Sequence, residues 1–355
     1  MAQQIPQGLE LPGPATRSRS RVQSRALLWA SRRARLLAPL MTLIVMVIFF
    51  SLVTDTFLQI SNFQNVATQI APVAVAAAGI TFVLLCAEID LSIAAVATFT
   101  GLVTAAVWVN NPFAISDLVL LTIVSIVFAI LLATIMGIIN GIFVAYIGIP
   151  SFMMTLAMLT IASGLAIWVG QGKPIFGVPD FIRTLGGVGT QVLGIPVIGI
   201  FALAVLLICE VILSYTKFGR YVYMTGANRE AAEMSGVNTR RVIMLSLTIC
   251  AVTAGLAGML YIGRLGSANP AAGDNLLIDA IAAVVLGGTS LFGGEGGIKN
   301  TLLGLLIFGV LSNGLNLIPG LDFNFKLALQ GIILVAALLL NVMALRLERV
   351  QTQTE

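Results

Sequence analysis

Residues 118–140 read LVLLTIVSIVFAILLATIMGIIN, a run that contains no charged side chain. A helix needs about 20 mainly apolar residues to cross a bilayer, because its backbone polar groups are all satisfied within the segment. We therefore predict a transmembrane helix here, which can extend to Ile147. Nine further runs bring the predicted spans to ten, and they cover 36–54, 67–87, 92–109, 152–169, 192–214, 242–263, 277–292, 301–318 and 327–345.

The composition of the whole chain agrees with this first segment. Of its 355 residues, 58% are hydrophobic and 10% are charged, whereas a soluble domain has about 45–50% and about 25%. Water-soluble folds, disordered chains and disulfide-stapled domains are excluded, so we predict an all-α polytopic membrane protein. There is no histidine, and Cys86, Cys209 and Cys250 lie in apolar runs without metal-ligand spacing, which favours packing roles.

The basic residues predict the orientation in the membrane. Those expected on the cytoplasmic side are Arg17, Arg19, Arg21, Arg25, Arg32, Arg33, Arg35, Lys217, Arg220, Arg229, Arg240, Arg241, Lys299, Arg346 and Arg349. With ten spans over 36–345, both termini are cytoplasmic and only Lys173, Arg183, Arg264 and Lys326 face outside. Residues 1–35 are predicted to be an unstructured cytoplasmic tail, although an organelle transit peptide has similar composition, and 346–355 a second tail. No nucleic-acid partner is expected.

A short pattern occurs twice. Residues 89–96 (IDLSIAAV) open the third predicted span, and residues 278–284 (IDAIAAV) open the eighth with one residue fewer. The two spans run in opposite directions, so the pattern favours a 5+5 inverted repeat, the design of many transporters. Chance similarity is the alternative in a chain this rich in Ala, Ile and Val.

Three acidic residues lie beside apolar runs. Glu88 and Asp90 precede the third span and Asp279 opens the eighth. Acidic groups at membrane depth are costly and commonly functional, which favours a place in a transport pathway. The alternative is that they only cap helices at the membrane surface.

The glycine-rich segment 287–297 (GGTSLFGGEGG) does not carry the P-loop pattern, in which Gly-Lys-Ser/Thr follows a first glycine after four residues. A tight turn and close helix packing explain these glycines better. The chain is therefore expected to hold no ATP site and no cofactor, and no nucleophile–base pair or metal cluster indicates an enzyme.

The segment 215–241 is the one sizeable polar loop between spans on the predicted cytoplasmic side. Within it, Asn228 is a suitable N-cap, Glu230 and Glu233 follow in the first turns, and Gly236 can end a helix. We predict a helix of about two turns outside the bilayer, on which Ala231, Ala232 and Met234 offer an apolar face to a partner. A solvated connector is the plainer alternative.

The stretch GANREAAEMSGVN at 226–238 resembles the EAA-x3-G coupling loop of the permease subunits of bacterial ABC importers. Together with IDLS at 89–92, DAIAAVVLGGTSL at 279–291 and NGLNL at 313–317, it resembles the ribose-type monosaccharide permeases in particular, over about 60–345. Two positions depart from the pattern: Ala87-Glu88 replaces the usual Gly-Gly, and Ser246-Leu247-Thr248 replaces the Ile and Leu-Pro of the wider importer pattern.

The resemblance implies a type II-like ABC importer permease in a bacterial inner membrane. Its partners would be a second permease chain, an ATP-binding cassette protein that binds the ATP, and a periplasmic sugar-binding protein that delivers a pentose, hexose or sugar alcohol and docks at 170–191 and 264–276. The ATPase would contact Asn228, Arg229, Glu230, Ala231, Ala232, Met234, Gly236 and Val237. Pathway candidates are Glu88, Asp90, Ser92, Asn140, Asp279 and Asn313, with Thr98 and Thr100 as further hydroxyl groups.

A different class of protein remains open at this point. A secondary transporter or channel would need no ATPase and would use Glu88, Asp90 and Asp279 as proton or cation sites. The segment 226–238 distinguishes the two classes, because only an importer permease needs it to bind an ATPase.

Overall fold

The computed structural model describes residues 39–187, 189–270, 273, 275–320, 322, 324–336 and 339. The predicted tails at 1–35 and 346–355 lie outside these residues. Within the described residues, seven helices are long and apolar enough to cross a membrane. They are α2 (Ile60–Leu85), α3 (Ile93–Asn110), α4 (Leu118–Ile142), α5 (Ser151–Gly170), α7 (Val197–Tyr215), α10 (Thr239–Leu265) and α12 (Ile298–Leu317). Each overlaps a predicted run, although α2 begins seven residues before the predicted start at 67 and α7 five residues after the predicted start at 192. The helix α4 continues through the π-helical turn η1 (Phe143–Ile147).

Three shorter apolar helices occupy the remaining predicted runs: Pro39–Val53, α11 (Leu276–Leu286) and Asn324–Ala336. The predicted span 277–292 is too long at its C-terminal end, since α11 stops at Leu286. Gly287 and Gly288 follow directly, and Gly288 adopts a φ of +92° that a helix does not contain.

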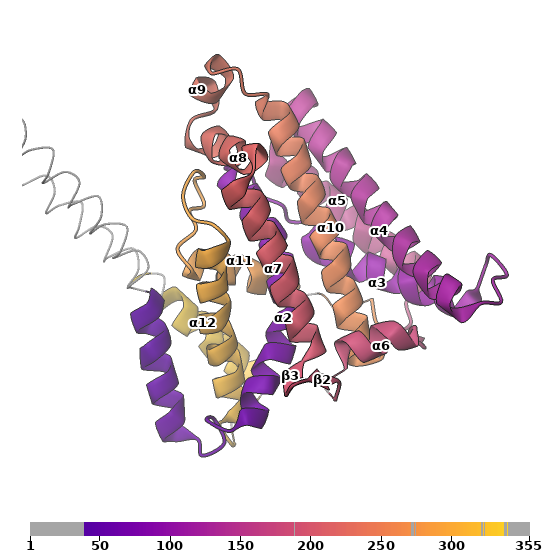
Figure 1. The fold of residues 1–355 in the computed structure, drawn as a ribbon, viewed down its shortest axis with the longest axis vertical. Helices are drawn as coiled ribbons and strands as arrows, with labels where there is room; N and C mark the ends of the chain where they lie inside the picture. The colour runs from indigo at the N-terminus through magenta and orange to yellow at the C-terminus, as the bar shows by residue number, and fades with distance from the viewer. Residues whose placement is uncertain are drawn as a thin grey trace, which may run out of the picture.

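Short elements lie at both ends of the bundle (Figure 1). One end, called here the α9 end, carries α8 (Lys217–Ala227) and α9 (Arg229–Met234). The other, called the α6 end, carries α6 (Asp180–Gly186) and four strands of two residues each. These strands form two antiparallel pairs, β1 (Ile175–Phe176) with β4 (Ser267–Ala268) and β2 (Gln191–Val192) with β3 (Ile195–Pro196).

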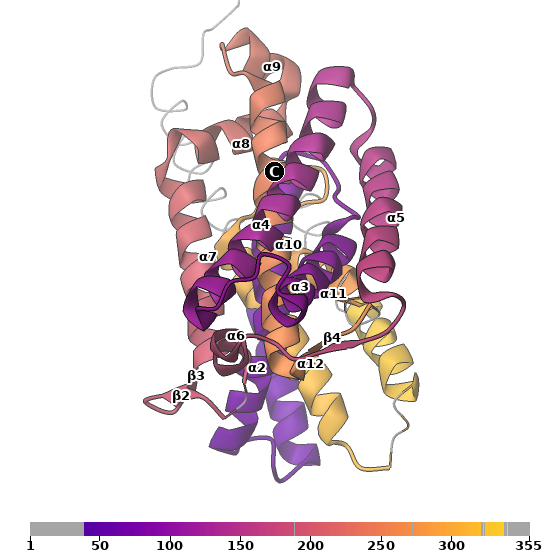
Figure 2. The ribbon, with the colours of Figure 1, turned by 90° about the vertical axis from the view of Figure 1, so that its right-hand side faces the viewer.

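The centre of the bundle is formed by α2 and α10, which pack along each other, with α3 against α10. In α2, 89% of the spanning window is buried, against 22% in α4 and in α5, and α4 and α5 lie on the side that faces the viewer in Figure 2. Small residues allow the close central packing: a Cβ on Gly258 of α10 would lie 2.0 Å from the Ala97 carbonyl oxygen of α3.

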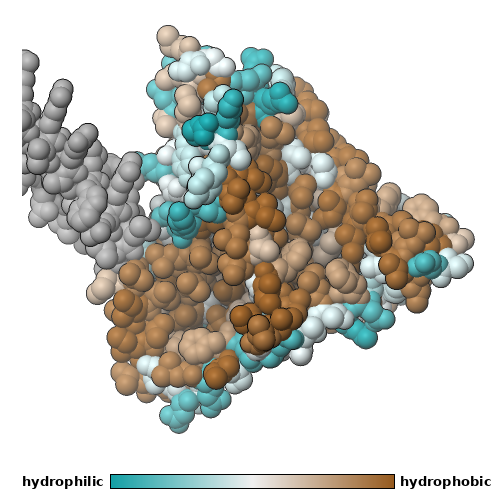
Figure 3. All heavy atoms as spheres, viewed as in Figure 1, coloured by the Kyte–Doolittle hydropathy of each residue, from teal (hydrophilic) through white to brown (hydrophobic). Residues whose placement is uncertain are grey.

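The surface has the pattern of a membrane protein. Figure 3 shows hydrophobic residues over the middle of the bundle, with hydrophilic residues gathered at the α9 end and along the opposite edge. An apolar belt between two polar ends is what a bilayer requires of the helices that cross it. The described helices and their surface therefore belong to a multi-pass membrane protein.

Candidate coupling site and its links to the bundle

The helix α9 forms where the sequence predicts it. Asn228 precedes it, and its Oδ1 accepts a hydrogen bond of 2.9 Å from the backbone N–H of Ala231. Beyond the helix, Gly236 adopts a φ of +81°, and the N–H of Val237 donates to the Ala232 carbonyl. A capped start and a left-handed glycine stop define a helix of six residues.

The two faces of α9 differ in their surroundings. Ala232 is 2% exposed and Val237 is buried, so both pack against the protein. Met234 is 90% exposed, and Glu230 and Ala231 are also on the surface. The predicted apolar face is thus wrong in one member: Ala232 points inward, and the free face holds Ala231 and Met234.

The helix α8 was not predicted from the sequence. Thr216 caps it, accepting from the N–H of Gly219 at 3.2 Å, while Gly219, Val222 and Thr225 form its buried side. A threonine followed by buried residues at every third position is the sequence pattern that could have indicated this helix. Tyr223 donates to the carbonyl of Gly296 at 2.9 Å, and burial raises the pKa of its hydroxyl, with the charge of Glu210 as a lesser cause. The hydroxyl therefore keeps its proton at neutral pH and remains a hydrogen-bond donor to Gly296.

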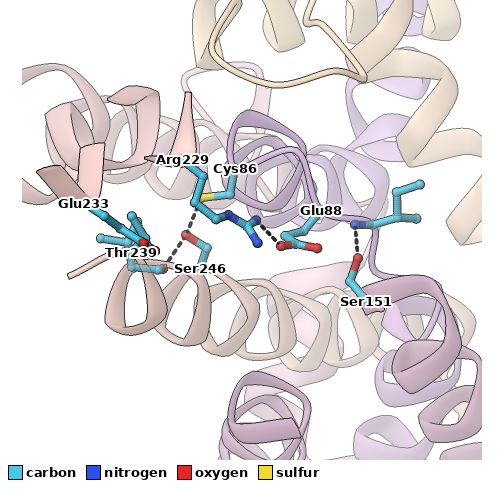
Figure 4. A network of polar contacts seen from close by, with 9 residues as sticks. Cys86, Glu88, Ser151, Arg229, Glu233, Thr239 and Ser246 are labelled. Carbon is cyan, nitrogen blue, oxygen red and sulfur yellow. Dashed lines mark hydrogen bonds and ion pairs between the residues drawn. The ribbon is translucent and has the colours of Figure 1, made fainter. Parts of the chain in front are cut away.

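A non-helical break at 86–92 separates α2 from α3. Two of its backbone N–H groups are bound by side chains of α5: Ile89 donates to Ser151 Oγ and Leu91 to Thr155 Oγ1, each at 3.1 Å. Irregular backbone among membrane helices is tolerated where such partners replace water. The break is therefore a fixed part of the bundle (Figure 4).

The break is also connected to α9 by charge. Arg229, the first residue of α9, forms an ion pair with Glu88 at 2.5 Å. The Glu88 side chain is 11% exposed and that of Arg229 is 48% exposed. Figure 4 shows this pair beside a contact between Cys86 Sγ and Ser246 Oγ of α10, and Glu233 of α9 accepting from Thr239, the first residue of α10.

Three predicted pathway residues form one buried cluster. Ser92 donates to Asp90 Oδ1 through both its backbone N–H (2.8 Å) and its hydroxyl (2.6 Å). The Asn140 amide of α4 donates to Ser92 Oγ at 3.2 Å. All three residues are buried, and within the described part of the chain Asp90 Oδ2 and Asn140 Oδ1 have no hydrogen bond of ordinary length, although the Cys250 thiol of α10 interacts with the Asp90 carboxyl. Asn140 Oδ1 is thus an acceptor left open inside the bundle.

The other candidates lie elsewhere. Asp279 is in the first turn of α11, and Asn313 is buried in α12 with no partner for its Oδ1. Glu88 is directed to α9. Thr98 lines a cavity of about 310 Å³ between α3, α5 and α11, together with Ser163, Pro270 and Leu277.

Fold and site together define a helical membrane protein with a capped surface helix connected to its core, the class of transport permeases. Residues 62–338 match the family described as branched-chain amino acid transport system, permease component. The chain belongs to this family.

Several relatives are similar to this chain over most of their length. The ribose import permease of Haemophilus influenzae is 36% identical over 83% of this chain and 90% of its own. The D-allose transport system permease of Escherichia coli is 33% identical over 84% and 88%. A probable ABC transporter permease of Escherichia coli is 32% identical over 89% and 92%. No solved structure matches the chain.

Proposed function

We propose that this chain is the membrane-spanning permease of an ATP-driven importer for a monosaccharide. The observation that carries the proposal is α9, a capped helix that exposes Glu230 and Met234 and is connected by charge to the break before α3. Membership of the permease family and the names of the similar relatives support it, and they do not favour a secondary transporter.

At the α9 end, an ATP-binding cassette protein would bind ATP and dock on the exposed side of α9. Glu230, Ala231 and Met234 would touch it. Asn228 and Gly236 hold the ends of the helix, and the buried Ala232 and Val237 anchor it to the bundle. Movement of the docked ATPase would then be passed to the bundle by an anchored helix rather than by a flexible loop.

At the α6 end, a periplasmic sugar-binding protein would dock. The pairing of β1 with β4 supports this, because it joins the segments 170–191 and 264–276 into one surface. Phe176 and Phe181 are largely exposed on it, at 74% and 62%. A second permease chain, identical or paralogous, would complete the pore.

The substrate would pass near α3, α5 and α11. The cavity lined by Thr98 and Ser163 lies between these helices, and the Asp90–Ser92–Asn140 cluster lies at the start of α3. The hydroxyl and amide groups of Thr98, Ser163, Ser92 and Asn140 suit a sugar that passes through without tight binding. Asp279 and Asn313 would contribute from α11 and α12.

The chain would cross a bacterial inner membrane ten times, with both termini in the cytoplasm. The three shorter helices fill the runs needed to bring seven spans to ten. Contacts at the two ends of α2 support its direction in this arrangement: Gln64 donates to the Gly194 carbonyl at the α6 end, and the Leu85 carbonyl accepts from the N–H of Gly294 near α8. A 5+5 inverted repeat would relate α3 to α11.

The docking proposal is tested with charge reversal at each end. The tagged chain would be expressed together with an ATP-binding cassette protein and a sugar-binding protein from the same organism. Glu230→Arg is expected to abolish co-purification of the ATPase, and the matched variant Asp180→Arg at the α6 end to leave it intact. Equal co-purification with both variants would contradict the proposal.

The substrate class is tested by uptake. Cells that express the complete transporter would be given labelled ribose, D-allose and leucine, the last because the family description names branched-chain amino acids. We expect uptake of a sugar and none of leucine. Uptake of leucine alone would show that the substrate is an amino acid and not a sugar.

A further inference from the structure

The Glu88–Arg229 ion pair joins two elements with different roles. Arg229 begins the helix proposed to meet the ATPase, and Glu88 belongs to the break that leads into α3. Two residues further along, Asp90 starts the buried cluster with Ser92 and Asn140. One charged contact therefore lies between the surface helix and the polar interior.

We propose that Glu88 and Arg229 are a positioning pair that transmits movement of α9 to the break at 86–92, and so to the start of α3. This inference rests on the proposed function, since it needs an ATPase that moves α9.

The surroundings of the pair make it suited to this role. Glu88 is held in a protected site, whereas Arg229 is half exposed and reaches in from the surface. The attraction between opposite charges is stronger where water is excluded, so the pair resists separation. The backbone of Glu88 is fixed as well, because its N–H donates to the Val83 carbonyl at 3.1 Å.

The other side-chain contacts of the break lead to the bundle and not to α9. Its bonds to Ser151 and Thr155 lead to α5, and the Cys86–Ser246 contact leads to α10. These contacts hold the break within the bundle, while the ion pair connects it to the helix outside. Loss of the pair would leave α9 attached through the buried Ala232 and Val237, through the Glu233–Thr239 contact to α10 and through the chain on either side.

The test follows the movement of the break and needs no transported substrate. Ile89, which is 38% exposed beside Glu88, would be replaced by cysteine in the full chain assembled with its ATPase. The rate of maleimide labelling at this cysteine would be compared without nucleotide and with ATP plus vanadate. In the chain whose one substitution is Ile89→Cys, we expect nucleotide to change the labelling rate severalfold.

The variant Glu88→Gln keeps the shape of the side chain and removes its charge. We expect it to retain co-purification of the ATPase and ATP hydrolysis, and to lose the change in labelling. Arg229→Lys, which keeps the charge, should preserve the change. Lys299→Gln removes the Lys299–Glu210 ion pair between α12 and α7 and should also preserve it.

Two results would overturn the inference. A normal labelling change in Glu88→Gln would mean that the pair transmits nothing, and the proposed function would still stand or fall with Glu230→Arg. Loss of the ATPase from Glu88→Gln would mean that the pair only holds α9 in its docking position. If Glu88→Gln does not accumulate, the comparison of Arg229→Lys with Arg229→Gln replaces it: equal responses contradict transmission, and loss in Arg229→Gln alone supports it.

Discussion

Asn140 and Ser92 are joined by a hydrogen bond of 3.2 Å although 48 positions separate them in the chain. Ser92 in turn binds Asp90, so two polar residues of the break and one of α4 meet where the bundle excludes water. A buried carboxylate is costly unless its hydrogen bonds are made, and here Oδ1 accepts two while Oδ2 accepts none of ordinary length from the described residues.

The first prediction separates the structural role of Asp90 from a role in transport. Asp90→Ala leaves the buried backbone N–H of Ser92 without its acceptor, which should destabilise the protein by about 1–3 kcal/mol. Asp90→Asn keeps an oxygen at that place and should lose less. Thermal unfolding of the detergent-purified chain measures both.

Uptake by the same variants decides whether the cluster lines the pathway. A pathway residue should show reduced uptake in Asp90→Asn at nearly normal stability. If uptake instead follows stability through both variants, Asp90 only holds the start of α3.

The second prediction concerns the contact of α8 with the end of α2. A Cβ on Gly226 would lie 1.8 Å from the Leu85 carbonyl oxygen and 2.8 Å from the N–H nitrogen of Gly294. Gly226→Ala must push α8 away from the bundle, so a loss of about 1–3 kcal/mol or more is expected. It should also weaken ATPase association, measured by co-purification.

The matched control is Gly164→Ala in α5. This glycine is also helical, but a Cβ there would meet no atom within 4 Å. Alanine is a better helix former than glycine by about 1 kcal/mol, so the control should be neutral or slightly stabilising. Equal losses in both variants would show that the close approach of α8 has no special importance.

The transmembrane helices could be predicted from the sequence because long apolar runs have few other structures available. The end of α11 was missed since Thr289, Leu291 and Phe292 continue an apolar composition past the glycines that end the helix. Likewise α9 could be predicted from Asn228 and Gly236. The helix α8, in contrast, has a threonine cap and a mixed polar and apolar sequence, so no apolar run indicates it.

The contacts within the site, by contrast, could not be predicted from the sequence. Composition indicated that Glu88 and Arg229 were notable, but not that they pair, because 141 positions separate them and only tertiary packing brings them together. Ser92 and Asn140 were grouped by chemical type alone. Burial of Ala232 likewise depends on how α9 lies against the bundle, which a helical pattern of six residues does not determine.

The third prediction tests the orientation of the two ends. Cys86, Cys209 and Cys250 are all buried, so new surface cysteines can be labelled over a low background. Asp180→Cys at the α6 end should react with an impermeant maleimide in spheroplasts, which expose the outer face of the membrane. Met234→Cys at the α9 end should react only after the membrane is opened. The opposite pattern would invert the proposed topology.

The fourth prediction uses the unequal burial of the Glu88–Arg229 pair. Arg229→Gln leaves Glu88 charged in a site where it is 11% exposed, whereas Glu88→Gln leaves Arg229 about half exposed and able to bind water. Breaking a fully buried pair costs about 3–5 kcal/mol and an exposed one about 0–1 kcal/mol. Arg229→Gln should therefore destabilise the chain more than Glu88→Gln, with a loss between these limits.

The double variant Glu88→Gln with Arg229→Gln completes the argument. It removes the uncompensated charge, so it should be more stable than Arg229→Gln alone, and thermal unfolding of all four proteins in detergent measures the coupling. If the two losses simply add, the charges do not interact across the gap between α9 and the break. In that case the pair could not transmit movement either, since a link without interaction energy exerts no force on the start of α3.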